Sequence, residues 1–105
     1  ATGGRGGGYD RQRRRTGAVR LRSGAKLRAN ENFRRALSEL DAYSWRRIRD
    51  HLKQIRDGEA ELTPSLFRPD LFHFFTDDYV IVLVVTHDRL TAVASALLLQ
   101  TGEDL

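Results

Sequence analysis

Two groups of side chains in this sequence could do chemistry. His73 and Tyr79 lie close together in the most apolar stretch of the chain, and an imidazole and a phenol can each donate and accept a proton. The second group consists of arginines near the N-terminus, whose planar guanidinium groups match the geometry of phosphate: Arg11, Arg13, Arg14, Arg15, Arg20 and Arg22. The first group indicates a ligand or partner site, and the second indicates contacts to nucleic-acid phosphates.

The charge of the chain is divided along the sequence. Residues 1–35 carry eleven basic and two acidic side chains, whereas residues 36–105 carry seven basic and twelve acidic ones. A basic arm joined to a mildly acidic body suits a polyanionic ligand, because the arm can follow phosphates while the body folds independently. A GC-rich coding sequence would also give many arginines, and both explanations stay open. We expect a nucleic-acid partner.

Other kinds of site are not indicated. The chain has no cysteine, which excludes disulfides and thiolate metal sites. His51, His73 and His87 lack the spacing of metal ligands, and there is no P-loop, nucleophile elbow or dinucleotide fingerprint. We therefore predict no metal and no cofactor. The basic residues of the segment 46–56 alternate with acids, which is typical of a solvated helix face.

The length of 105 residues supports one folded domain. Residues 1–17 are rich in glycine and arginine and are predicted to be disordered, either as a solvated extension or as a nucleic-acid-binding arm. Residues 18–105 are expected to form the domain. No apolar run approaches the roughly 18 residues of a membrane span, and the beginning of the chain does not resemble a secretory signal. We expect a cytoplasmic protein with no membrane partner.

A short strand and two amphipathic helices are predicted in the first half of the domain. Residues 18–22 alternate apolar and basic side chains, as a strand would. Asn30 is the expected N-cap of a helix with an apolar stripe at Phe33, Leu37 and Leu40. Ser44 is expected to cap a second helix that ends at Gly58, with a stripe at Trp45, Ile48, Leu52 and Ile55. The two helices should form an antiparallel hairpin that needs a surface to pack against.

Residues 71–99 predict a β-meander that supplies this surface. Segments 71–75 and 79–85 are expected strands separated by the turn Thr76-Asp77-Asp78, and a second turn at 87–89 precedes a third strand. This last segment is rich in alanine and leucine and could instead be a helix, so both alternatives stay open. The expected fold class is α+β, with an N-terminal helical hairpin packed on one face of a small antiparallel sheet.

The lengths of the turns predict which side chains share a face of the sheet. A three-residue turn places His73 opposite Ile81, and the next turn places Ile81 opposite Ala94. One face is then wholly apolar and would be covered by the helices: Phe72, Phe74, Val80, Val82, Val84 and Val93. The other face would stay uncovered, as a ligand groove or a partner interface. It would hold Leu71, His73, Phe75, Tyr79, Ile81, Leu83, Ala92 and Ala94.

The order of these elements resembles that of the RelE/ParE toxin superfamily over roughly residues 18–100. The segment 71–82 lies where that family has its middle strands, and Asp78-Tyr79 followed by Val80-Ile81, together with residues 88–91, is similar to its turn and strand motifs. The resemblance implies a bacterial toxin-like protein that is neutralised by an antitoxin and acts on RNA at the ribosome or on a protein target such as gyrase. It implies an antitoxin-like partner on the exposed sheet face, and RNA rather than DNA as the nucleic acid.

If the chain is an enzyme, the resemblance implies a metal-independent endoribonuclease. Ribonucleases of that family place basic side chains on the open sheet face to stabilise charge on the phosphate, and a tyrosine or histidine assists proton transfer. The candidate catalytic residues are then His73, Tyr79 and Arg68. The sequence departs from the family at Val80, where the family has an arginine. Two other functions stay open: a non-catalytic nucleic-acid-binding regulator that uses the basic arm, and a protein-interaction module.

Overall fold

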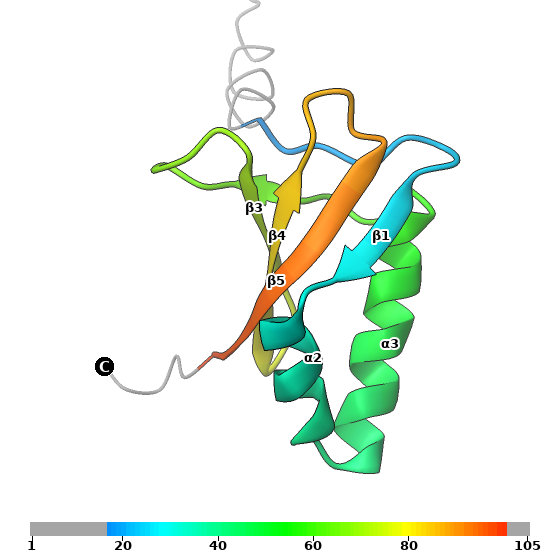
Figure 1. The fold of residues 1–105 in the computed structure, drawn as a ribbon, viewed down its shortest axis with the longest axis vertical. Helices are drawn as coiled ribbons and strands as arrows, with labels where there is room; N and C mark the ends of the chain where they lie inside the picture. The colour runs from blue at the N-terminus through cyan, green and yellow to red at the C-terminus, as the bar shows by residue number, and fades with distance from the viewer. Residues whose placement is uncertain (1–16, 101–105) are drawn as a thin grey trace, which may run out of the picture.

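One five-stranded sheet and two helices make up the fold of residues 17–100. The computed structural model describes residues 17–100. Figure 1 shows both helices near the edge of the sheet that β1 and β5 form. In chain order the elements are β1 (Lys26–Ala29), α2 (Glu31–Ser38), α3 (Ala42–Arg56), β2 (Thr63–Pro64), β3 (Leu71–Phe75), β4 (Tyr79–Val85) and β5 (Thr91–Leu99). The expected α+β class is confirmed. The predicted arm, residues 1–17, lies outside the described residues except for Gly17.

The sheet has the order β1-β5-β4-β3-β2, and it is mixed rather than antiparallel. β1 pairs parallel with β5, while the other neighbours are antiparallel. The expected N-terminal helical hairpin is therefore wrong in its position, because the two helices follow β1 in the chain. They connect this first strand to a meander whose last strand returns beside it (Figure 1).

The first strand is not where the sequence pattern placed it. Residues 18–22 form only an isolated bridge, in which Val19 and Leu62 exchange two backbone hydrogen bonds of 3.0 and 2.7 Å. A turn containing Gly24, at a φ of +84°, separates this bridge from β1. The same alternation of apolar and basic residues recurs in β1, whose apolar members Leu27 and Ala29 pack against the core. Alternation alone could not decide which of the two copies pairs with β5.

Both helices begin at side-chain caps. The prediction for Asn30 is confirmed, because its Oδ1 accepts a 2.8 Å hydrogen bond from the backbone N–H of Phe33. The prediction for Ser44 is wrong. Asp41 caps α3, and its carboxylate accepts a 3.1 Å hydrogen bond from the N–H of Ser44. Hydrogen bonding from Ser44 also holds the pKa of Asp41 below its ordinary value.

The turn between β3 and β4 has two residues rather than three. Thr76 follows β3 directly and continues its pairing with β4, since its N–H donates to the carbonyl of Tyr79 at 2.8 Å and its hydroxyl bonds to the Tyr79 backbone. Asp77 and Asp78 alone make the turn. His73 therefore lies opposite Val82 and not opposite Ile81 as expected. This shift of one residue exchanges the faces of every side chain in β4 relative to β3.

The last alanine- and leucine-rich segment, for which the sequence leaves strand and helix open, forms the strand β5. It pairs with β4 on one side and with β1 on the other. A β-bulge between the pairs of Val82 and Leu83 leaves Ser95 as the extra residue, so that Ala94 lies opposite Leu83 and Leu97 opposite Ile81. The expected pairing of Ile81 with Ala94 is therefore wrong.

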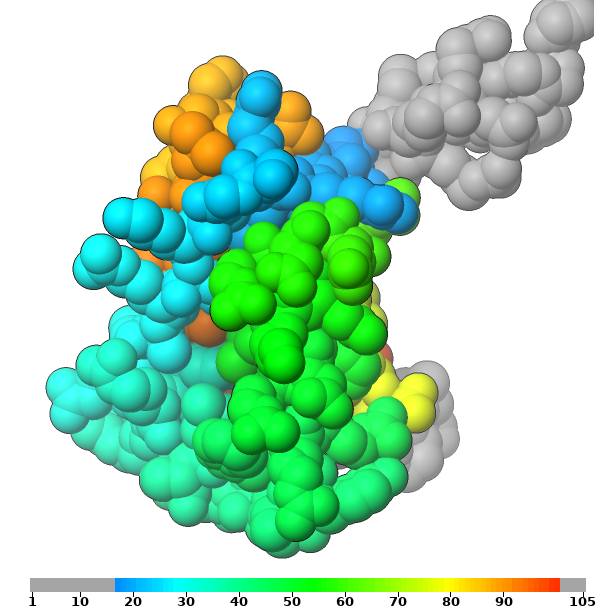
Figure 2. Space-filling view, turned by 90° about the vertical axis from the view of Figure 1, so that its right-hand side faces the viewer, coloured from blue at the N-terminus to red at the C-terminus, as the bar shows by residue number. Residues whose placement is uncertain are grey.

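The helices cover one face of the sheet, called here the helix-covered face. It contributes Phe72, Phe74, Tyr79, Ile81, Leu83, Val85, Ala92, Ala94 and Leu97 to the core. Phe33 of α2 and Ile48 and Ile55 of α3 are buried against these residues, as predicted. The prediction that Trp45 belongs to the buried stripe of α3 is wrong, because its side chain is exposed and lies outside the core. The small side chains of Ala92 and Ala94 leave room for the helices beside β5. Viewed from the side, β1 and α3 border a hollow in the surface (Figure 2).

Gly58 ends α3 in a left-handed conformation, with a φ of +78°, and a Cβ atom there would lie 2.7 Å from the carbonyl oxygen of Leu21. We expect Gly58→Ala to lower the free energy of unfolding by about 2 kcal/mol, since it adds backbone strain and displaces Leu21 from the core. Urea denaturation followed by circular dichroism measures this. Gly24→Ala is the matched control, because its φ is also positive but its Cβ would meet nothing within 4 Å. An equal effect at both positions would show that the contact with Leu21 is unimportant.

Candidate functional site

The three candidate catalytic residues are not brought together. His73 lies opposite Val82 and Tyr79 opposite Leu99, and Val82 and Tyr79 project from opposite sides of β4. His73 is therefore on the uncovered face of the sheet, and Tyr79 is on the helix-covered face. The expectation that the two share a surface is wrong, because it depended on a three-residue turn.

Arg68 is held by its own neighbour. Its Nε and Nη2 donate to the two carboxylate oxygens of Asp70 at 3.0 and 2.8 Å. This bidentate hydrogen bonding raises the pKa of Arg68 and lowers that of Asp70. The pair fixes the loop before β3, and Arg68 is thereby committed to a carboxylate rather than open to a phosphate.

Tyr79 borders a cavity that is too small for a substrate. The cavity lies between α3 and the β3–β4 turn and has a volume of about 20 Å³. It is lined by Tyr43, Ser44, Arg47, Ile48, His51, Thr76, Asp78 and Tyr79. Such a volume holds about one water molecule, whereas ligand pockets measure roughly 300–1,000 Å³. A water there would satisfy His51 Nδ1, which is buried and has no hydrogen-bond partner within residues 17–100.

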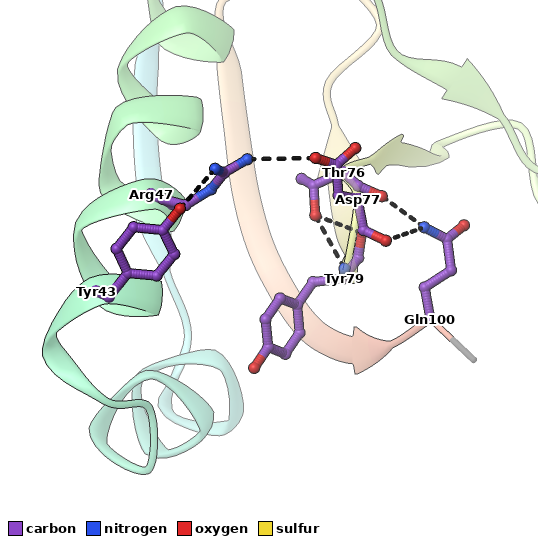
Figure 3. A network of polar contacts seen from close by, with 6 residues as sticks. All are labelled: Tyr43, Arg47, Thr76, Asp77, Tyr79 and Gln100. Atoms are coloured by element: carbon purple, nitrogen blue, oxygen red, sulfur yellow. Dashed lines mark hydrogen bonds and ion pairs between the residues drawn. The ribbon is translucent and has the colours of Figure 1, made fainter. Parts of the chain in front are cut away.

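A polar network ties the β3–β4 turn to both of its neighbours (Figure 3). On one side Arg47 of α3 donates to the Tyr43 hydroxyl at 3.1 Å and lies 3.5 Å from a carboxylate oxygen of Asp77. On the other side Nε2 of Gln100 donates to the carbonyls of Thr76 and Asp77. The hydrogen bond to Tyr43 raises the pKa of Arg47, so this cation stays charged at every working pH. We interpret the network as a clamp on the turn and not as a reactive centre.

Only two of the six arginines predicted to bind nucleic acid lie among the described residues. Arg11, Arg13, Arg14 and Arg15 lie outside the described residues. Arg20 is exposed and lies 3.6 Å from a carboxylate oxygen of Glu61, and Arg22 is exposed near Asp88. The carboxylate of Asp88 is held mainly by the Thr86 hydroxyl, which lowers its pKa. The positive charges of Arg20 and Arg22 are therefore partly neutralised by these nearby acids.

The surface that the helices leave uncovered, called here the open face, is predominantly apolar. It consists of Leu71, His73 and Phe75 of β3, Val80, Val82 and Val84 of β4, Val93, Ala96 and Leu98 of β5, and Lys26 and Arg28 of β1. Phe75 and Leu98 are 53 and 51% exposed. Val82 is buried although it does not belong to the core cluster, so neighbours on its own face cover it. The alternation of side chains along the sequence predicted an uncovered face. It assigned the valines to the face that the helices cover, which is wrong.

Comparison with known proteins gives no relative: no protein-family model matches the chain, and no curated protein matches it either. Within residues 17–100, neither helix is long and apolar enough to cross a membrane. Function is therefore inferred from the residues and their geometry.

Measurements of unfolding free energy can test the conclusion that His73 and Tyr79 lie on opposite faces of the sheet. We expect Tyr79→Ala to lower the free energy of unfolding by about 2 kcal/mol, because Tyr79 packs against the core, whereas His73→Ala on the open face should cost less than about 1 kcal/mol. Tyr79→Phe controls for the hydroxyl and should be nearly neutral. Urea denaturation of the three variants measures the order. A larger loss from His73→Ala than from Tyr79→Ala would contradict the assignment of faces.

Proposed function

We propose that this chain is the toxin-like component of a bacterial toxin–antitoxin pair, and that its protein partner covers the open face. The observation that carries the proposal is a sheet with helices on one side and a predominantly apolar surface on the other. Contiguous apolar surface of this kind marks protein interaction sites on soluble domains. The element order of a strand, two helices and a meander, on which the resemblance to the RelE/ParE superfamily depends, supports the same function.

The chemistry of the open face indicates what its partner looks like. Its centre is a row of valines on β4 flanked by Val93, Ala96 and Leu98 on β5. Lys26 and Arg28 lie along its β1 border, because they pair with Thr91 and Val93. An amphipathic segment with an apolar stripe and acidic residues along one flank complements this arrangement. An antitoxin-like segment of that composition is the proposed occupant.

The proposal places toxicity in binding to a target rather than in cleavage by the predicted catalytic set. His73 and Tyr79 lie on opposite faces, and Arg68 is paired with Asp70. Endoribonuclease activity stays a prediction without an assembled site among residues 17–100. A plain protein-interaction module would use the same open face, and it differs from the proposal in causing no growth arrest.

Controlled expression tests the proposal. Induction of the full chain in a bacterial host should arrest growth, and co-expression of the product of the adjacent reading frame should restore it. Colony counts after induction, with and without the second gene, measure both effects. We expect Val84→Glu to abolish the rescue, since a carboxylate on the apolar open face would be buried without a partner charge on binding.

Leu66→Glu is the matched control for that substitution. Leu66 is 96% exposed in the loop before β3 and is not part of the open face, so the variant should be rescued like the natural chain. Absence of arrest by the natural chain would contradict the toxin function. Arrest with equal rescue of Val84→Glu and Leu66→Glu would place the partner elsewhere.

A further inference from the structure

A groove with basic walls runs between the edge strand β1 and helix α3. Figure 2 shows it as the hollow between these two elements, with an atom of β5 at its bottom. The groove has a volume of about 190 Å³ and is lined by Leu27, Arg28, Ala29, Arg49, Leu52, Lys53, Arg56 and Ala94. Its apolar members form the floor, and its four charged members are all cations. This surface is distinct from the open face, and Arg28 stands on the edge strand between the two.

The cations of α3 are arranged in a row. Arg49, Lys53 and Arg56 follow one another at spacings of four and three residues, which places them on one side of the helix. The row extends about 10 Å along the helix axis. A row of this length can contact neighbouring phosphates of one nucleic-acid strand.

Most of this charge is not neutralised by neighbouring acids. No ion pair within residues 17–100 involves Arg28, Arg49 or Lys53, and only Arg56 is paired, with Asp57 at 3.1 Å. No carboxylate lines the groove. Among residues 17–100 these three cations have no carboxylate partner, and a polyanion that binds the groove relieves the repulsion between them.

Aromatic surface lies beside the row. The guanidinium carbon of Arg49 is 5.1 Å from the ring centroid of Trp45, which is 39% exposed. Single-stranded nucleic acids are bound by this combination, in which a positive groove follows the backbone while unpaired bases stack on aromatic rings and guanidinium planes. An acidic peptide would use the cations but not the rings.

We propose that the groove between β1 and α3 binds the phosphate backbone of a single-stranded nucleic acid. Arg49, Lys53 and Arg56 contact successive phosphates from α3, Arg28 contacts the strand from β1, and Trp45 stacks a base at the end of the row. The site does not depend on the proposed toxin function, because no protein partner takes part in it and Arg28 is the one residue of its lining that also belongs to the open face.

Salt-dependent binding of the full chain tests the proposal. The probe is a fluorescently labelled oligouridine of about twelve nucleotides, with oligothymidine of the same length and polyglutamate as comparisons. Fluorescence anisotropy at several salt concentrations gives the affinity and the log–log salt slope. We expect Arg49→Gln/Lys53→Gln to weaken oligouridine binding by about tenfold and to reduce the magnitude of the slope by about 1.4, since each phosphate contact on a single strand contributes about 0.7.

Arg35→Gln/Arg68→Gln is the matched control. It removes the same net charge from exposed positions of α2 and of the loop before β3, outside the groove, and should change neither quantity by more than a small amount. Trp45→Ala should weaken binding further than Trp45→Phe, which keeps a stacking ring. Equal losses in the two double variants would show that only net charge matters and would overturn the site. Tighter binding of polyglutamate than of either oligonucleotide would assign the groove to an acidic protein instead, and no binding of oligonucleotide at low salt would also overturn it.

Discussion

The division of the sheet into a helix-covered face and an open face depends on the length of one turn. Asp77 and Asp78 alone connect β3 to β4, because the Thr76 hydroxyl and N–H both bond to the backbone of Tyr79. That turn sets the register, and the register decides that Ile81 and Leu83 enter the core while Val82 and Val84 form the open face. The clamp formed by Arg47 and Gln100 holds the turn in place from both sides. A slip of one residue would exchange core and surface along the whole of β4.

The remaining architecture follows from covering only one side of the sheet. The helices supply Phe33, Ile48 and Ile55, and these are enough to close a core over β4 and β5. Within residues 17–100, no helix or strand forms a layer on the opposite side of the sheet. Two surfaces result, and they differ in kind. The open face is apolar and complements an amphipathic protein segment, whereas the groove beside it is cationic and complements phosphate. Arg28, on the edge strand, borders both, so occupancy of one surface should influence the other.

Much of the fold could be predicted from local chemistry. The cap at Asn30, the helix end at Gly58, the apolar stripes and the strands β3 and β4 each follow from interactions within a few residues. The predictions that were wrong depended on contacts between residues far apart in the sequence. Thr76 is compatible with either a turn or a strand end, and the alternation at residues 18–22 recurs at 26–29, so only pairing with the rest of the sheet decides between them. Arg49, Lys53 and Arg56 are exposed, as a solvated helix face requires, but their sequence does not reveal that β1 lies beside them. A spacing of four and three residues was the signal that could have indicated a shared surface.

The register of β3 against β4 is the most direct test of this account. Backbone nuclear Overhauser effects in the isotope-labelled full chain report which residues lie opposite each other across an antiparallel pair, without any substitution. The account predicts cross-strand contacts between His73 and Val82 and between Phe75 and Val80. Contacts between His73 and Ile81 would mean a three-residue turn, would return the valines to the core, and would contradict the open face on which the proposed function depends.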